Sequence, residues 1–333
     1  MGVNCGSSRS DSVPDVYYCS NLQFPLLQTC DFKMQRIIGT GNYSQVRLAR
    51  LHGQPVAVKV MNKALLYRQK QVQHVLVEKQ VLRLLRSPFV VSLLGTCQDE
   101  VDLFCVMEYV AGGELFKVLV KRCKLPKVEA CFYLSEVVQA LCCLHAVGCL
   151  YRDTKPENVL LTAEGHVKLA DLGFAKLLSR NERTFTMCGT PEYIAPELIS
   201  GSGCGLELDW WQVGVLLYEM LAGKTPFMDS SPYRLYEKVL TASPNLSYRV
   251  FDEDSCSLLQ GLLAKLPQQR LTQAQILAHP FFRSVRWLAL LHTPPPFVPV
   301  LTDPFDTSCF DVFEEKHSEE RLDSDLQQCF KDY

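Results

Sequence analysis

The chain carries the sequence Tyr151-Arg152-Asp153-Thr154-Lys155-Pro156-Glu157-Asn158, and Asp171-Leu172-Gly173 follows thirteen residues after Asn158. Four groups in these two segments suit the transfer of a phosphoryl group to a hydroxyl. Asp153 can accept the hydroxyl proton, and Lys155 can neutralise the moving phosphate. Asn158 and Asp171 offer the oxygen ligands that Mg²⁺ prefers. The pattern therefore predicts a phosphoryl-transfer site.

Two short apolar runs, Val159–Leu161 and Val167–Leu169, lie between the two segments and are joined by a turn at Glu164-Gly165. This spacing predicts a β-hairpin that holds both metal ligands close together. A lone aspartate in a loop is more often a solvated turn residue. The interpretation therefore depends on whether the other parts of such a site occur elsewhere in the chain.

The composition is typical of a soluble globular protein. Of 333 residues, 47% are apolar and 21% are charged, and this length allows two lobes with separate cores. The formal net charge of −2 argues against a protein built to coat nucleic acid. From Asp303 to Tyr333, ten acidic residues stand against three basic ones, so we expect an acidic C-terminal tail.

The fifteen cysteines include no C-x-x-C pair, and the sequence shows no secretory signal. We therefore expect buried free thiols in a reducing compartment, which favours a cytoplasmic location. No apolar run approaches the length of a membrane span. The best candidate, Val137 to Leu150, is interrupted by Gln139 and His145.

Residues 1–31 are rich in Ser, Asp, Asn and Pro and predict an extended arm. The first seven residues approach the N-myristoylation pattern, although Gly6 stands where serine or threonine is expected. Acylation of Gly2, with a second chain on Cys5, would associate the protein with a membrane. An ordinary terminus of small residues is the alternative.

Residues 37–48 predict a strand, a turn containing Gly39 and Gly41, and a second strand. The backbone amides of such a turn can fold over phosphates, although a plain hairpin is the alternative. Val56–Lys59 then predicts a strand that ends in a half-buried lysine, which needs an anion. A helix predicted over Gln71–Arg86 offers Glu78, which would hold Lys59 over nucleotide phosphates. Glu78 could instead be an exposed helix charge.

The remaining pattern predicts a boundary between two lobes and then a helical lobe. Phe104–Tyr109 predicts a buried strand, after which a nucleotide base could bond to the backbone between Glu108 and Val110. Long helices are predicted over Lys127–Val147 and over Trp210–Ala222. The second helix is apolar nearly all round, which indicates a buried element. We expect Asp209 to cap it and to bond to amides at its start or in the loop around Asp153.

Two further features complete the large lobe. Short helices are predicted as far as Phe282, and Arg270 is a candidate partner for Glu197. The ordered motifs G-T-G-N-Y-S-Q-V, V-A-V-K, Glu78, Y-R-D-T-K-P-E-N, D-L-G, A-P-E, D-W-W and Arg270 together resemble those of the protein kinase family over residues 32–282. The segments V-M-E-Y-V-A-G-G-E-L-F, M-C-G-T-P-E-Y-I-A-P-E and D-W-W-Q-V-G-V-L-L-Y-E-M resemble, within the AGC group, the cAMP-dependent protein kinase catalytic subunits.

This resemblance implies an α+β, bilobal protein kinase fold: a small β-rich N-lobe with one main helix, a larger helical C-lobe and an AGC-type tail. The implied boundaries are 1–31 for the arm, 32–109 for the N-lobe, 110–282 for the C-lobe and 283–333 for the tail. It also implies serine/threonine phosphorylation with ATP and Mg²⁺. Asp153 would be the base, Lys155 and Lys59 would contact phosphates, and Glu78 would orient Lys59.

The resemblance further implies a set of residues around the nucleotide, with Met107 as gatekeeper, Phe310 of the tail beside the adenine, and Asn158 and Asp171 on the metal. The nucleotide-binding residues are Ile38, Gly39, Thr40, Gly41, Asn42, Tyr43, Ser44, Val46, Ala57, Lys59, Met107, Glu108, Val110, Glu114, Glu157, Asn158, Leu160, Asp171 and Phe310.

Regulation is implied at three places. Thr186, eleven residues before Glu197, matches the activation-loop phosphosite, and Arg152, Lys176 and His74 are the expected cations for its phosphate. Phe330 and Tyr333 would dock in a hydrophobic pocket beside the Glu78 helix. A second phosphosite in the tail would be Ser318 or Ser324.

The resemblance implies that basic peptides, Arg-Arg-x-Ser/Thr followed by an apolar residue, are the substrates. Carboxylates would read the arginines, and an apolar socket would accept the residue after the target. Glu157 and Glu219 would bind the nearer arginine, Glu114 and Glu314 the farther one, and Met187, Pro191 and Ile194 would form the socket.

Several departures from the family pattern bear on partners. Ser44 replaces the third loop glycine, Leu172 a phenylalanine and Thr154 a leucine. Phe185 and the non-basic segment 201–206 lie where a cAMP-binding regulatory subunit would bind, so that partner stays open. The alternatives to an active protein kinase are a pseudokinase scaffold, which typically lacks one of the four catalytic groups, and a small-molecule kinase, which needs no segment like Gly189–Glu197.

Overall fold

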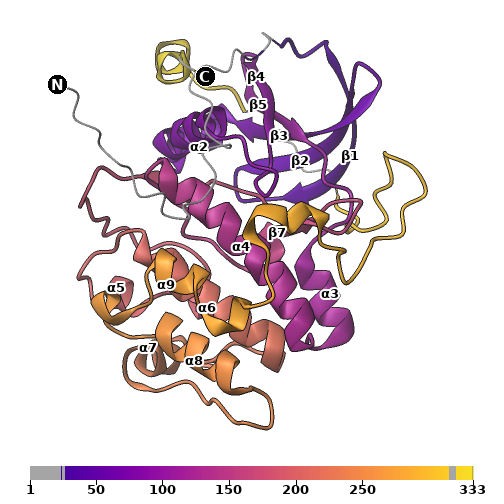
Figure 1. Ribbon diagram of the computed structural model, residues 1–333. Helices are drawn as coiled ribbons and strands as arrows, with labels where there is room; N and C mark the ends of the chain where they lie inside the picture. Colours follow the sequence, from indigo (N-terminus) through magenta and orange to yellow (C-terminus); the bar gives the residue numbers. More distant parts are fainter. Residues whose placement is uncertain (1–23, 25–26, 315–319, 332) are drawn as a thin grey trace, which may run out of the picture.

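The computed structural model describes residues 24, 27–314, 320–331 and 333. It shows a small lobe built on a β-sheet and a larger helical lobe, with the C-terminal segment returning to the small lobe (Figure 1). The expected N-terminal acylation sites, Gly2 and Cys5, and the candidate phosphosite Ser318 lie outside the described residues. The two-lobed arrangement implied by the sequence is confirmed.

The small lobe is a five-stranded antiparallel sheet in the order β1-β2-β3-β5-β4. Its strands form where apolar and polar residues alternate, because successive side chains point to opposite faces. Lys59 lies inside β3, three residues before its end, rather than at the end as expected. The strands are β1 Phe32–Thr40, β2 Ser44–Leu51, β3 Gln54–Asn62, β4 Leu93–Gln98 and β5 Asp102–Glu108.

Two helices follow β3, where the sequence predicted one main helix. The short α1, Lys63–Arg68, begins at Asn62, whose side chain accepts a hydrogen bond from the amide of Leu65. The longer α2, Val72–Leu84, packs beside the sheet and buries Val75, Glu78 and Leu82 (Figure 1). This packing brings Glu78 to the face of β3 that carries Lys59.

The large lobe is organised around two long buried helices, α4, Lys127–Ala146, and α6, Glu207–Ala222. By length and apolarity α4 could also cross a membrane, contrary to our expectation, but 83% of its most apolar window is buried within the protein. The other helices of this lobe are α3 Leu115–Arg122, α5 Pro196–Ile199, α7 Pro232–Thr241, α8 Glu253–Leu262 and α9 Gln273–Leu277.

Two short antiparallel strand pairs support the loop that begins at Tyr151. Cys149–Leu150 (β6) pairs with Lys176–Leu177 (β9) on one side of it. Val159–Leu161 (β7) pairs with Val167–Leu169 (β8) on the other, as the sequence predicted. Gly165 supplies the positive φ of 95° that the β7–β8 turn requires.

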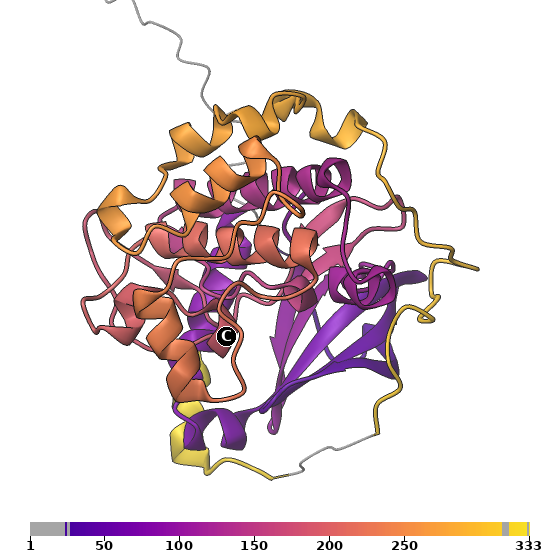
Figure 2. The ribbon, with the colours of Figure 1, turned by 90° about the horizontal axis from the view of Figure 1, so that it is seen from below.

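The C-terminal tail runs from the large lobe along the edge of the sheet and ends against the small lobe (Figure 2). Arg36 of β1 donates to the hydroxyl of Thr307, and Lys117 of α3 forms an ion pair with Asp311, so the tail contacts both lobes. Its last turn, Ser324–Phe330 (η7), buries Phe330 completely. The Lys79 ammonium lies 4.8 Å from the centre of the Tyr333 ring, as expected for docking beside α2.

The thirteen cysteines in the described part of the chain are all free thiols. Seven are buried, but Cys30, Cys123 and Cys329 are exposed, so the expectation of buried thiols holds only in part.

Candidate active site

A cavity of about 220 Å³ lies between the two lobes, under the β1–β2 turn. Most of the residues expected to bind the nucleotide line it, including Met107 and the tail residue Phe310. They are Ile38, Gly39, Thr40, Gly41, Ser44, Val46, Ala57, Lys59, Met107, Glu108, Val110, Glu114, Glu157, Asn158, Leu160, Asp171 and Phe310. Asn42 and Tyr43, at the tip of the turn, are not among the lining residues.

Lys59 joins three elements at the back of this cavity. Its ammonium donates to Glu78 of α2 at 2.7 and 3.0 Å and to Asp171 Oδ1 at 3.0 Å. Burial alone would lower the pKa of Lys59, but the Asp171 and Glu78 carboxylates raise that pKa well above its ordinary value. Lys59 in turn lowers the pKa of Asp171. Lys59 therefore stays charged, and Asp171 stays ionised as a metal ligand must be.

The carboxylate of Asp153 has two different oxygens. Oδ2 accepts hydrogen bonds from Asn158 Nδ2 at 2.6 Å and lies 2.9 Å from Lys155 Nζ. Oδ1 is buried and has no hydrogen-bond partner among the described residues. Burial raises the pKa of Asp153, and Lys155 opposes that shift. Oδ1 is thus available to accept a proton, while Oδ2 fixes the orientation of the carboxylate.

Lys155 also donates to the hydroxyl of Thr190 at 3.2 Å. This contact links the loop around Asp153 to the segment Gly189–Glu197. No sequence spacing predicts this contact, because the two residues lie 35 positions apart.

Asp209 does not cap α6 as expected. It lies in the first turn of the helix, and its carboxylate accepts from the amides of Tyr151 at 2.9 Å and Arg152 at 2.8 Å. His145 of α4 lies 2.7 Å from the same carboxylate. The second of the two expected roles, binding to the loop around Asp153, is therefore the one the structure shows.

Thr186 is exposed, and its three expected cations, Arg152, Lys176 and His74, have different surroundings. Lys176 donates to Thr184 at 3.2 Å instead. Burial and the charge of Arg152 lower the pKa of His74, which favours its neutral form. Arg152 remains the main candidate, since its buried Nη1 has no hydrogen-bond partner in the described part of the chain.

Three of the four carboxylates expected to read a peptide, Glu114, Glu157 and Glu219, are half-buried, and Glu314 is exposed. Glu219 of α6 accepts a hydrogen bond from the hydroxyl of Tyr193, and burial raises the pKa of Glu219. Glu157 and Glu114 lie together along the cavity between the lobes. Neither Glu157 nor Glu219 forms an ion pair with a lysine or arginine in the described residues.

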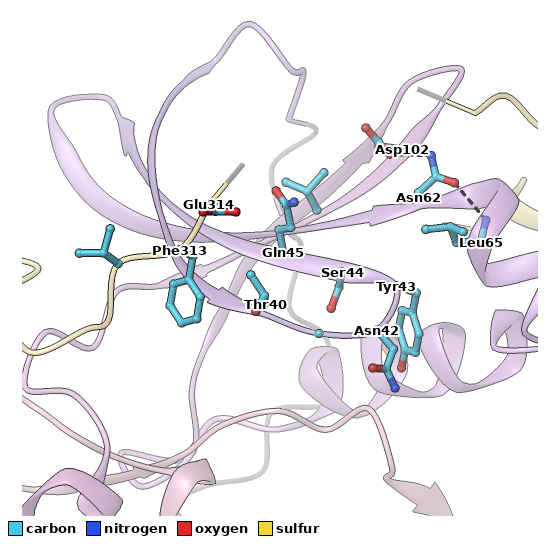
Figure 3. A pocket seen from close by; sticks show the side chains of 13 residues that line it. Thr40, Asn42, Tyr43, Ser44, Gln45, Asn62, Leu65, Asp102, Phe313 and Glu314 are labelled. Atoms are coloured by element: carbon cyan, nitrogen blue, oxygen red, sulfur yellow. Dashed lines mark hydrogen bonds between the residues drawn. The ribbon is translucent and has the colours of Figure 1, made fainter. Parts of the chain in front are cut away.

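Two expected substrate residues are placed elsewhere. Ile194 is only 4% exposed because it packs in the main hydrophobic core, so Met187 and Pro191 are left as the accessible apolar surface. Glu314 does not join Glu114 along the cleft. It lines a separate cavity of about 700 Å³ together with Asn62 and Asp102 (Figure 3).

That larger cavity lies on the opposite face of the sheet. β3 contributes Val60 and Asn62 to it, whereas Ala57 and Lys59 face the cleft between the lobes. Alternate residues of a strand point to opposite faces, so a sheet separates Glu314 from Glu114.

Comparison with known proteins agrees with this geometry. The family model described as Protein kinase domain matches residues 32–282. The chain belongs to the protein kinase family. It is 40% identical over 87% of its length to a cAMP-dependent protein kinase catalytic subunit of Arthrobotrys oligospora, 57% of which is covered. It is also 40% identical to the Saccharomyces cerevisiae cAMP-dependent protein kinase type 3, over 86% of this chain and 74% of that protein.

A third relative is the Mus musculus cAMP-dependent protein kinase catalytic subunit PRKX, 40% identical over 89% of this chain and 86% of that protein. The resemblance of this kinase domain to cAMP-dependent protein kinase catalytic subunits is therefore confirmed. The chain spans 57% of the length of the Arthrobotrys protein, and 65% and 45% of the length of two further curated relatives.

Proposed function

We propose that this protein is an active serine/threonine kinase that transfers the γ-phosphate of ATP to a hydroxyl of a protein substrate. The proposal rests on the different surroundings of the two carboxylate oxygens of Asp153. Oδ2 is held in place by Asn158 and Lys155. Oδ1 is buried and has no hydrogen-bond donor among the described residues, so it is available to accept a proton from a substrate hydroxyl. A pseudokinase has no need for such a preserved base.

The residues present suit the nucleotide and the metal. Lys59 is a buried, charged donor for phosphate oxygens, and Asn158 and Asp171 are hard oxygen ligands that line the same cavity. When bound, Mg²⁺ would neutralise charge on the phosphates. This chain's own residues orient the triphosphate, accept the hydroxyl proton at Asp153 Oδ1 and offset the charge of the moving group through Lys155.

We further propose that the substrates are basic peptides. Glu157 lines the cleft and lies close enough to Glu219 for its charge to raise the pKa of that carboxyl. Neither has a lysine or arginine partner in the described structure, which favours a guanidinium from outside. Met187, half exposed, and Pro191 offer apolar surface on either side of a segment whose Thr190 bonds to Lys155, for the residue after the target. Arg-Arg-x-Ser/Thr-apolar sequences combine these requirements.

Phosphorylation of Thr186 would complete the active state in this proposal. A phosphate there would give the buried Nη1 of Arg152 an anionic partner, and the same negative charge would raise the pKa of His74. Mass spectrometry of the active fraction is expected to find Thr186 phosphorylated, and a fully active enzyme with unmodified Thr186 would contradict this part.

The test of the main proposal is transfer of labelled phosphate from [γ-³²P]ATP to a synthetic Arg-Arg-Ala-Ser-Leu peptide. A matched peptide with alanine in place of serine is the control, and a sugar or other small alcohol tests the small-molecule alternative. We expect labelling of the serine peptide alone. No transfer to any acceptor by Thr186-phosphorylated protein would favour the pseudokinase instead.

A further inference from the structure

Gln212 lies one helical turn after Asp209 on α6, and its side chain is 2% exposed. Both the oxygen and the nitrogen of its carboxamide form hydrogen bonds with the loop that carries Asp153. Oε1 accepts from the amide of Thr154 at 3.0 Å, and Nε2 donates to the carbonyl of Arg152 at 2.9 Å. The two bonded groups belong to the residues immediately before and after Asp153.

The backbone at this point needs such support. Arg152 has a φ of +73°, in the left-handed region that non-glycine residues rarely adopt. Its amide is held by Asp209 at 2.8 Å and its carbonyl by Gln212 at 2.9 Å. Both polar backbone groups of Arg152 are therefore fixed by α6, and conformations of this kind persist where neighbouring contacts over-determine them.

The same carboxamide also lies beside the segment that faces the substrate. A Cβ atom placed on Gly189 would lie 3.1 Å from the carbonyl oxygen of Arg152 and 3.9 Å from both Asp153 Oδ1 and Gln212 Nε2. Gly189 has a φ of +99°. Gly189 thus lies close to the Arg152 carbonyl, to the free oxygen of the base and to the Gln212 carboxamide.

We propose that Gln212 is a positioning residue of the phosphoryl-transfer reaction. Its hydrogen bonds to Arg152 and Thr154 fix the backbone on both sides of Asp153 and thereby orient Oδ1 toward the substrate hydroxyl. Gln212 is not among the residues that line the cavity between the lobes. This inference rests on the proposed kinase activity, and it assigns the glutamine a role separate from that of Asp209, which holds only the N-terminal side of the same peptide.

Gln212→Met tests the proposal, because methionine has a similar length and fills the same space but offers neither hydrogen bond. We expect kcat to fall about 10- to 100-fold, the size of effect that small displacements of a reacting group produce. KM for ATP and for peptide is expected to stay close to that of the wild type, because the residues that bind them are unchanged. Active sites are counted by titration with a fluorescent ATP analogue, so that kcat is expressed per folded site.

Gln212→Asn keeps a carboxamide that is one methylene shorter and can make at most one of the two bonds. Its kcat is expected to lie between those of the wild type and Gln212→Met, and it carries the test if the methionine variant does not fold. Gln139→Met, which alters a buried glutamine of α4 that makes neither of these two bonds, is the control and should keep the wild-type kcat.

An unchanged kcat per folded site in either Gln212 variant would overturn the proposal, as would a loss of activity matched by an equal loss of ATP-binding sites. If the wild type itself transferred no phosphate, the proposed function would fail rather than this inference.

Discussion

Lys59 of β3 and Glu78 of α2 form a buried ion pair in which the ammonium lies 2.7 and 3.0 Å from the two carboxylate oxygens. Both side chains are less than 8% exposed. Cys105, the residue paired with Lys59 across the sheet, lies on β5, and Lys79, the neighbour of Glu78, contacts the ring of Tyr333. The pair thus sits where the sheet, the helix and the end of the tail meet.

Replacing Lys59 with methionine removes the charge that this junction directs at the nucleotide phosphates. We expect kcat/KM for ATP to fall about 100- to 1,000-fold, the cost of losing one preorganised electrostatic contact. Steady-state phosphorylation of a basic peptide measures it. Lys33→Met, on the exposed side of β1, is the matched control and should retain activity.

Glu197 and Arg270 form a second buried pair, at 2.8 and 2.9 Å, with both side chains at most 1% exposed. Removing one partner leaves an uncompensated buried charge, so Arg270→Met should lower the free energy of unfolding by about 3–5 kcal/mol. The Glu197→Met/Arg270→Met double variant should lose less than the sum of the single losses. Urea unfolding curves measure all four proteins, and strict additivity would contradict the pairing.

His166 and Glu136 predict a pH dependence of stability. The Glu136 carboxylate lies 2.6 Å from His166 Nδ1 and raises the pKa of that histidine, while burial raises the pKa of Glu136. A group whose folded pKa is raised contributes stability below its unfolded pKa, about 6.5 for histidine, and loses it as pH rises through the folded value. Between pH 6 and 9 the wild type should therefore lose stability relative to a Glu136→Gln/His166→Gln variant. A constant difference over that range would refute the coupling.

Peptide selection is the next expected outcome. Glu157→Gln/Glu219→Gln keeps shape, and the glutamine at position 219 can still accept from Tyr193, but the negative charge is gone. The preference for arginine over alanine two residues before the target should fall about 10- to 100-fold, the strength of a hydrogen bond to a charged group. A peptide array measures it. A preference for acidic residues before the target, or for proline after it, would count against the proposed substrate class.

The amino-acid sequence predicted the site most accurately where the functional residues are contiguous or lie in one strand and the helix that follows it. The β7–β8 hairpin follows from two apolar runs and a glycine turn, and the Lys59–Glu78 pair from a buried lysine that needs an anion. Both depend on local patterns that survive folding unchanged.

What sequence did not predict depends on contacts between distant segments. Glu314 was expected beside Glu114, but it lines the cavity on the opposite face of the sheet, and no periodicity in an irregular tail indicates this path. Gln212 lies in a helix that is apolar nearly all round, and no local pattern predicts the partners of its polar side chain. These partners, in the loop around Asp153, are visible only in the folded structure. Ile194 likewise packs inward because burial in the main hydrophobic core removes its apolar side chain from water.

The central claim is that Asp153 is the catalytic base of a protein kinase, and Asp153→Asn tests it most directly. The substitution keeps the shape of the side chain while removing the proton acceptor. Steady-state transfer of phosphate from ATP to the serine peptide should fall by at least about 1,000-fold, because positioning and charge stabilisation act together in this reaction. ATP binding, measured by titration with the fluorescent analogue, should remain. Turnover equal to that of the wild type would contradict the account.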